Sequence, residues 1–186
     1  MVKSQVLQYD KHLIKSCLKK DRKAQNQLYK ECYSFMMAIC WRYAENKEEA
    51  IEFANHGFLK ILLNLKKYKT KVPFELWVRR VVINEVIDQL RKKKRYREKI
   101  EIREENDLPQ LANPSLDEAQ TERIEWIKEK SKNLPNMTGK VFNLYAFDGY
   151  KHQEIAEMLN ISEGTSQWHY SVAKQQLREW SHQKEA

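Results

Sequence analysis

Hydrophobic residues return with helical spacing through almost the whole first half of the chain. Between Lys11 and Arg95 they recur every three or four positions, and Pro73 is the only proline there. This pattern predicts four helices, near residues 10–19, 22–44, 47–65 and 73–95. An apolar stripe on the second helix is expected to face a core, and it consists of Leu28, Cys32, Phe35, Ile39 and Tyr43.

The fourth predicted helix has one face for packing and one for binding. Pro73 suits its first turn, where the missing backbone N–H costs no hydrogen bond. Asp88 and Arg91 form an i, i+3 pair that is expected to brace the helix. The residues expected to be buried are Phe74, Trp77, Val81, Ile87 and Leu90. The polar residues expected to stay accessible to phosphates and bases are Arg79, Arg80, Asn84 and the terminal basic run at 91–95, which begins with Arg91 and Lys92.

A lysine-rich loop at 66–71 precedes this helix and contains one aromatic residue, Tyr68. Proteins hold bases freed from a duplex by stacking them on rings while lysines bind the backbone. Tyr68, Lys69 and Lys71 are therefore candidates for binding single-stranded nucleic acid. In the alternative interpretation, Tyr68 anchors the loop on the core and the lysines are only solvated.

Periodicity lapses after the fourth helix and resumes near residue 116. The segment 97–122 contains Asn-Asp-Leu-Pro and Asn-Pro-Ser sequences and two acidic clusters, which is typical of a flexible linker. Further helices are predicted near 116–132, 138–147, 150–159 and 163–180. The expected fold class is all-α, with one small helical domain at 1–96, the linker at 97–122 and a second small domain at 123–186.

Residues 150–181 have the pattern of a helix-turn-helix. Ile155 and Leu159 share one face of its first helix, and Asn160 follows at a position that favours positive φ. Ile161 is expected to fill the turn and Ser162 to cap the second helix. The inward face of that second helix should consist of Tyr170, Ala173, Leu177 and Trp180.

The outward face of the second helix carries short or amide side chains of the kind that reach base edges in a major groove. Trp168 and Val172 on this face would need a partner surface or thymine methyl groups to cover them. In the alternative interpretation, this is a solvated face of a structural domain. The candidate reading residues are Thr165, Gln167, Trp168, His169, Ser171 and Val172.

Charge points to a polyanionic partner. The 186 residues contain 34 Lys and Arg against 26 Asp and Glu, a net charge of +8. Residues 1–95 carry 22 basic and 10 acidic side chains, so the positive field belongs to the first half. No run is apolar enough to span a membrane or to act as a signal peptide, so a cytoplasmic protein is expected. Cys17, Cys32 and Cys40 are expected to be small buried residues rather than disulfide or metal partners.

Taken together, these features resemble the sigma-70 family of bacterial transcription initiation factors, in its two-domain extracytoplasmic function (ECF) subgroup. The resemblance covers residues 10–95 and 120–181, and it is specific because several weak motifs occur in the right order. The motifs are 46–52 (NKEEAIE), 58–60 (FLK), Phe74 with Trp77, then Asn84, Asp88 and Arg91, Leu134-Pro135 before Val141-Phe142, 154–159 (EIAEML) and 161–165 (ISEGT).

The resemblance implies that the first domain binds core RNA polymerase and melts the −10 promoter element, while the second reads the −35 element. Tyr68, the lysine loop and Asn84 would line a pocket for an unstacked −10 base, with Arg79, Arg80, Arg91 and Lys92 near the backbone. The polymerase would dock on Glu49, Glu52, Asn55 and Leu59. An anti-sigma factor is a further implied partner, whereas no cofactor, metal or small-molecule substrate is expected.

The chain departs from the family pattern at both binding surfaces. His56 stands where the family usually has an acidic residue, and Asn55 stands where it has glutamine. In the recognition helix, positions that are usually basic are occupied by Gln167, His169 and Val172, and Ser166 occupies an apolar core position. The polymerase contact and the −35 sequence read are therefore expected to differ from those of typical members.

Two other classes of protein compete with this interpretation. A stand-alone helix-turn-helix regulator would bind duplex operators without polymerase, usually as a dimer, but no dimerisation helix is evident. An enzyme is not expected, because the sequence has no phosphate-binding glycine loop and no His-Glu-x-x-His motif. His56 and His152 are expected on helix surfaces rather than on a metal.

Overall fold

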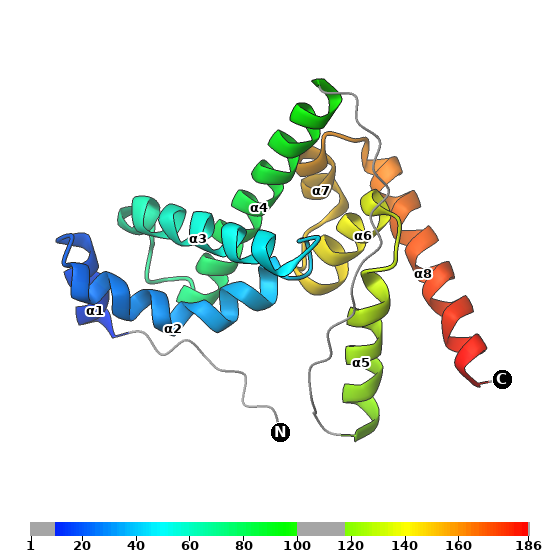
Figure 1. The fold of residues 1–186 in the computed structure, drawn as a ribbon, viewed down its shortest axis with the longest axis horizontal. Helices are drawn as coiled ribbons and strands as arrows, with labels where there is room; N and C mark the ends of the chain where they lie inside the picture. Colours follow the sequence, from blue (N-terminus) through cyan, green and yellow to red (C-terminus); the bar gives the residue numbers. More distant parts are fainter. Residues whose placement is uncertain (1–9, 100–117, 186) are drawn as a thin grey trace. The chain divides into compact units, whose positions relative to one another are not determined.

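The computed structural model describes residues 10–99 and 118–185, which form eight α-helices and no strand, as the all-α prediction requires (Figure 1). The chain divides into two compact units, one of residues 3–111 and the other of residues 112–186 with the first two residues. Each unit is described by itself below, and the predicted linker falls largely at 100–117, outside the described residues.

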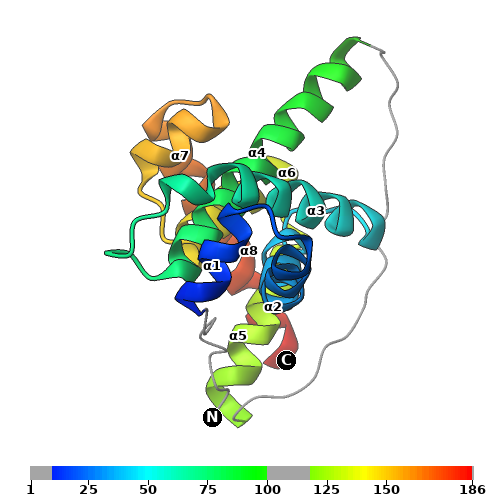
Figure 2. The same ribbon diagram turned by 90° about the vertical axis from the view of Figure 1, so that its left-hand side faces the viewer.

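The N-terminal unit consists of α1 (Lys11–Leu18), α2 (Arg22–Cys40), α3 (Lys47–Asn64) and α4 (Phe74–Lys99), with a 3₁₀ turn, η1 (Leu65–Lys67), after α3. In Figure 1, α3 lies beside both α2 and α4, and α2 also packs on α1 and α4 (Figure 2). Side-chain caps explain where three of these helices begin. Asp10, Asp21 and Asn46 each accept a hydrogen bond from a backbone N–H in the first turn that follows.

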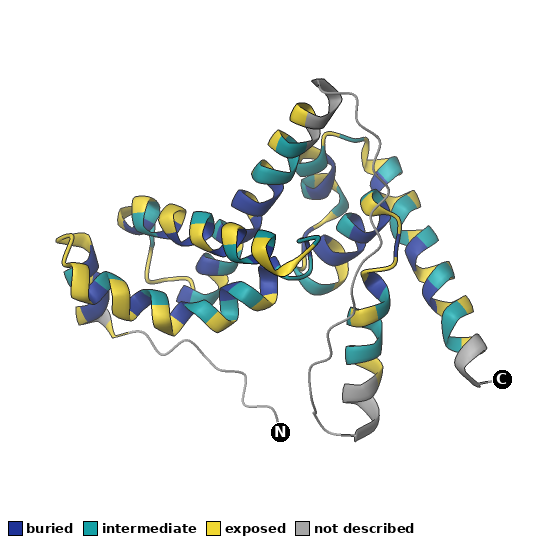
Figure 3. Ribbon diagram, viewed as in Figure 1, coloured by how far each residue is buried: buried dark blue, intermediate teal, exposed yellow. Residues whose placement is uncertain are grey.

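The buried sides of these helices meet in one apolar core, drawn dark blue in Figure 3. In α4, the buried stripe differs from the one predicted. The residues predicted to be buried include Trp77, Val81 and Leu90, which are only half-buried. Phe74 and Ile87 are buried as predicted, and the other buried side chains lie with them in two i, i+4 rows on the side that faces α2 and α3, namely Val78, Val82 and Val86 after Phe74, and Ile83 before Ile87. Phe35 of the predicted α2 stripe is also half-buried.

Helix ends depart from the prediction because periodicity alone does not mark them. The second predicted helix was expected to reach residue 44, but α2 ends at Cys40 and residues 41–43 form a turn. Conversely, α4 continues to Lys99 and α5 begins at Glu118, so helix extends into both ends of the predicted linker. The domain limits themselves stay a prediction.

The C-terminal unit consists of α5 (Glu118–Ser131), α6 (Asn136–Phe142), a π-helical turn η2 (Asn143–Phe147), α7 (His152–Leu159) and α8 (Glu163–Glu185). The long α8 packs against α5, α6 and α7. Leu134, Phe142, Ala173 and Leu177 form a small core, and Tyr170 and Trp180 pack against it. The helix predicted at 138–147 is thus divided into α6 and η2, and the last helix runs five residues beyond its predicted end.

The turn between α7 and α8 has the geometry that the sequence predicts. Asn160 ends α7 in the left-handed conformation, with φ of 53°. The Ile161 N–H donates to the Ala156 carbonyl at 3.0 Å, and the Ser162 hydroxyl accepts from the Thr165 N–H at 3.0 Å. The expected asparagine at positive φ and the serine cap are therefore both confirmed, and the C-terminal unit contains a helix-turn-helix.

All three cysteines are free and buried, as predicted. Burial raises the pKa of the Cys32 and Cys40 thiols to about 12, so both stay protonated and unreactive near neutral pH. Within residues 10–99 and 118–185, no helix has the length and apolar character needed to cross a membrane.

Candidate nucleic-acid interface

The solvent side of α4 is polar and accessible, as predicted. Asn84 lies in the middle of this face and is exposed, and Arg80 and Lys92 on either side of it are exposed as well. Arg79 is half-buried, with its guanidinium 5.1 Å from the centre of the Phe35 ring. The face therefore presents an amide flanked by cations, which suits a base held between backbone phosphates.

Tyr68 belongs to an aromatic cluster at the start of α4. Its ring centre is 5.1 Å from that of Phe74 and 5.3 Å from that of Trp77, and its hydroxyl donates to the Val72 carbonyl at 2.9 Å. These contacts favour the interpretation in which Tyr68 anchors the lysine loop on the core. Lys69 and Lys71 in the same loop are exposed.

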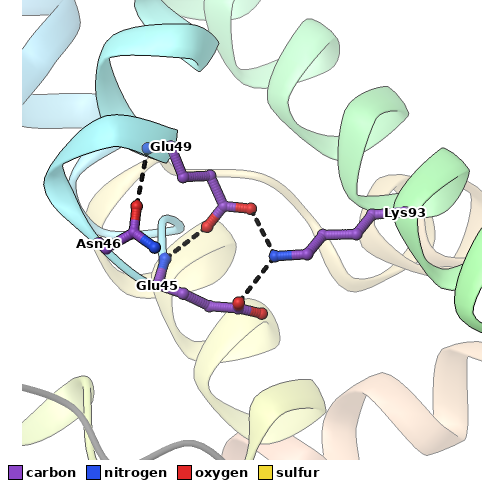
Figure 4. Close-up of polar contacts among 4 residues, drawn as sticks. All are labelled: Glu45, Asn46, Glu49 and Lys93. Atoms are coloured by element: carbon purple, nitrogen blue, oxygen red, sulfur yellow. Dashed lines mark hydrogen bonds and ion pairs between the residues drawn. The ribbon is translucent and has the colours of Figure 1, made fainter. Parts of the chain in front are cut away.

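One lysine of the basic run at the end of α4, Lys93, is partly buried and turns toward the start of α3. The Lys93 ammonium lies 2.7 Å from a Glu45 carboxylate oxygen and 2.8 Å from a Glu49 carboxylate oxygen (Figure 4). The other Glu49 oxygen accepts from the Glu45 N–H at 2.6 Å, and Asn46 accepts from the Glu49 N–H at 2.8 Å. These four residues, called the Lys93 clamp below, fasten the start of α3 to α4.

This clamp could not be predicted from the sequence, because its partners are more than 40 positions apart. Glu49 is a predicted polymerase contact, but its side chain is only 11% exposed and is engaged within the unit. A groove of about 620 Å³ adjoins the clamp, and its walls include Glu48 and Glu52 on one side and Lys92 and Tyr96 on the other. Charged walls of both signs make this groove suited to a polar partner.

The outer face of α3 carries the other predicted polymerase contacts. Glu52, Asn55 and Leu59 are all exposed, with Leu59 at 52%. The Asn55 amide oxygen accepts from the Tyr29 hydroxyl at 2.9 Å, so this side chain is held from α2. Leu63, one turn further along, is 67% exposed and was not singled out from the sequence, although its i, i+4 spacing from Leu59 could have identified it.

A buried carboxylate was also not anticipated. Glu85, one residue after Asn84, is 4% exposed and lies 3.5 Å from the Lys60 ammonium of α3. It also accepts from the Gln89 amide at 2.6 Å. Glu85 therefore serves as a second polar connection between α3 and α4.

In the C-terminal unit, α8 presents the predicted reading face only in part. Gln167, Trp168 and Ser171 are exposed. Trp168 is the hydrophobic residue among these three, and it is 59% exposed. Thr165 and Val172 are half-buried at the edges of the face. The reading face is thus centred on Trp168, one turn into the helix.

His169 is the exception among the predicted reading residues. Its Nδ1 atom lies 3.0 Å from the Thr138 hydroxyl of α6, and the imidazole is half-buried. Burial lowers the pKa of His169, which keeps the ring neutral near pH 7. One ring nitrogen of His169 is thus engaged with α6, and its contact with DNA stays a prediction.

A second histidine makes an equivalent bond on the other side of α8. His152 of α7 has its Nδ1 atom 2.9 Å from the hydroxyl of Ser166, which is completely buried. The His152 ring stacks on Tyr145 with centres 4.3 Å apart. This pairing explains how a serine can occupy the core position that the family usually fills with an apolar residue, and it shows that His152 is not a simple surface residue.

The chain matches known proteins in both units. Residues 28–96 match the family described as Sigma-70 region 2, and residues 125–177 match Sigma-70, region 4. The ECF RNA polymerase sigma factor SigW of Bacillus subtilis (strain 168) is 28% identical over 153 residues, which cover 75% of this chain and 79% of that protein.

A solved structure shares the fold. It is that of the sigma factor RpoE from Bartonella quintana, in complex with the anti-sigma factor NepR. The TM-score is 0.54 with 17% sequence identity, over 83% of this chain and 94% of that one. The family matches lie in the expected order and contain the α3, α4 and helix-turn-helix features described above. The chain therefore belongs to the sigma-70 family of transcription initiation factors, as an ECF sigma factor.

Proposed function

We propose that this sigma factor binds core RNA polymerase, directs it to promoters and promotes melting of the −10 element. The observation that carries the proposal is the solvent face of α4, where exposed Asn84 lies between exposed Arg80 and Lys92. Melted DNA needs an amide or ring to hold an unpaired base and cations to hold its phosphates. The same helix buries its other face in an apolar core, so the binding groups stand on a rigid support.

The proposed polymerase contact is the outer face of α3. Glu52, Asn55 and Leu59 are exposed there in successive turns, and the Tyr29 hydroxyl holds the Asn55 amide in one orientation. Leu59 and Leu63 supply an apolar surface that a protein partner would cover. Glu49 contributes mainly by holding α3 against α4.

The proposed reader of the −35 element is α8, through Gln167, Trp168 and Ser171 with Thr165 and Val172 at the edges. The first helical residues of a recognition helix are those that meet base edges in a major groove. We further propose an anti-sigma factor as a regulatory partner, as in the Bartonella quintana complex. The proposed role involves no cofactor and no reaction catalysed by the chain itself, since the polymerase carries the chemistry.

The test of this function is run-off transcription with core RNA polymerase and a promoter library. Start sites should appear only when the full chain is added. If the chain alone binds duplex operators tightly at physiological salt and adds no start sites, it is a stand-alone regulator and the proposal is wrong.

The role of α4 has a separate test. Asn84→Ala should reduce permanganate reactivity of the melted −10 strand by about 2- to 12-fold, equivalent to losing a hydrogen bond to the base of about 0.5–1.5 kcal/mol. Asn26→Ala is the matched control, because Asn26 is also an exposed asparagine on a helix of the same unit. Polymerase binding should be unchanged in both variants. Equal footprints in the two variants would contradict the assignment of Asn84.

A further inference from the structure

Building on the proposed reading of the −35 element by α8, we propose that Trp168 determines its specificity by contacting a thymine methyl group. His169 and Thr138 are inferred to be positioning residues for this contact. Neither role follows from the family pattern, in which the position of His169 is usually basic. The inference rests on the exposure of the Trp168 ring and on the contacts that connect this ring to His169 and His169 to Thr138.

Trp168 is a large apolar side chain placed where water would otherwise surround it. It is 59% exposed and lies on the same face of α8 as the exposed Gln167 and Ser171. The opposite face of the helix is closed by buried Ser166, Ala173 and Leu177, so Trp168 cannot turn into the core. An indole exposed in this way gains most by meeting an apolar group on a partner.

The indole is supported from one side. Its ring centre is 4.8 Å from that of His169, with the two planes at 67° in an edge-to-face arrangement. His169 is itself held by its bond to the Thr138 hydroxyl at 3.0 Å, and Thr138 is only 3% exposed. Because Thr138 belongs to α6, which packs on α8, the rigid body of the unit fixes the orientation of the exposed ring.

The chemistry of the major groove selects the target. Each base pair presents hydrogen-bond donors and acceptors there, but the C5 methyl group of thymine is the only apolar group on a base edge. The indole offers a broad carbon surface and a single N–H donor. Polar neighbours such as Gln167 can pair with other base edges, whereas Trp168 gains most from the methyl group.

The experiment uses holoenzyme assembled from core polymerase and the full chain. A −35 library is selected first, and each thymine of the selected element is then replaced by deoxyuridine, which removes only the methyl group. At one position, this replacement should weaken promoter binding by about 4-fold, the equivalent of one buried methyl group. In Trp168→Ala holoenzyme the same replacement should have no effect. A methyl effect that persists in Trp168→Ala, or its absence in the wild type, overturns the proposal.

The positioning role is tested with two variants that each remove one buried hydroxyl from a histidine bond at α8. Thr138→Val breaks the bond to His169 and should reduce the methyl effect at the Trp168 position. Ser166→Ala breaks the bond to His152, which is not in the set of contacts behind Trp168, and should leave the methyl effect intact. Equal methyl effects in these two variants would contradict the positioning role, whatever they do to stability.

Failure of this inference and failure of the proposed function give different results. If wild-type holoenzyme selects no promoter element, both are wrong. If it initiates from a selected −35 element whose thymine methyl groups make no difference, only the role of Trp168 is wrong.

Discussion

The two units keep their binding helices in place with different polar contacts. In the N-terminal unit, the Lys93 clamp joins α4 to α3 through ion pairs of 2.7 and 2.8 Å at the edge of the apolar core. In the C-terminal unit, hydroxyl–imidazole bonds of 2.9 and 3.0 Å join α8 to α7 and α6. The first arrangement uses ion pairs and the second uses hydrogen bonds of hydroxyl groups.

The groups in the two arrangements also differ in burial. The Lys93 side chain is 33% exposed, so its charge keeps part of its hydration. Ser166 and Thr138 are almost completely buried, where a charge would cost several kcal/mol unless it were fully paired. The N-terminal unit uses ion pairs at the partly exposed Lys93 and also at Glu85, which is 4% exposed, whereas the C-terminal unit holds its recognition helix with hydrogen bonds of two buried hydroxyl groups.

The largest expected effects come from the cores that support both arrangements. Ile61→Ala in α3 and Leu177→Ala in α8 should each reduce the free energy of unfolding by about 2–5 kcal/mol, because each leaves a cavity. Hydrogen exchange should show the loss in the substituted unit only. Leu63→Ala is the control, since Leu63 is 67% exposed and should change stability by no more than about 0.5 kcal/mol. If Ile61→Ala increases hydrogen exchange equally in both units, the two units unfold together and are not independently stabilised.

The next prediction concerns Lys92 and Lys93 at the end of α4, which are expected to have different roles in stability and in DNA binding. Lys93→Met should reduce the free energy of unfolding by about 1–3 kcal/mol, because it leaves the Glu49 carboxylate without its ion pair. Lys92→Met should hardly change stability, since Lys92 is exposed, but it should make the salt dependence of promoter binding less steep by about 0.7–0.9 in log–log slope. Denaturant unfolding and salt titration of holoenzyme binding measure the two. If Lys93→Met reduces the salt dependence of promoter binding and Lys92→Met does not, Lys93 is the phosphate contact and this assignment is wrong.

A smaller effect tests the turn before α8. Asn160→Ala should reduce the free energy of unfolding by about 1 kcal/mol, because alanine is disfavoured at φ of 53°. Asn160→Gly should be close to neutral, since glycine adopts this conformation without a steric penalty. Thermal unfolding of the two variants measures the difference, and equal melting temperatures would show that the turn is not a source of strain.

The smallest expected effect is a pH dependence of the C-terminal unit. Burial lowers the pKa of His169 in the folded state, so below about pH 6.5 the unfolded chain binds more protons than the folded one at this site. This contribution to stability is complete above pH 6.5 and is lost as the pH falls. The loss of stability between pH 7.5 and 5.5 should be smaller in His169→Asn than in the wild type. An unchanged difference would show that His169 does not titrate in this range.

Much of the fold could be predicted because helical periodicity is a local property. All eight predicted α-helices have a counterpart, and the Asn160 turn and Ser162 cap are where the sequence places them. The ends of α2 and α4 could not be predicted from periodicity, since apolar spacing continues beyond the end of α2 at Cys40 and lapses before the end of α4 at Lys99. The buried stripe of α4 was shifted toward Val78, Val82 and Val86, because two neighbouring helices, rather than one, determine which side of it is covered.

The exposure of the candidate site residues could be predicted where polar residues recur on one side of a helix. Asn84, Arg80, Gln167 and Trp168 are accessible as expected. Polar contacts with distant partners could not be predicted, and the bond between His169 and Thr138 is the clearest case. A histidine on the polar side of a helix looks the same in the sequence whether it meets DNA or a threonine 31 positions away.

The sequence by itself determined the helices, their order, the helix-turn-helix and the concentration of positive charge in the first half of the chain. These depend on neighbours three or four positions apart and on composition. Only the tertiary structure decided which polar groups remain available for binding. Glu49 and Lys93 are engaged with each other, and His169 with Thr138, because packing brings together side chains that are far apart in the sequence.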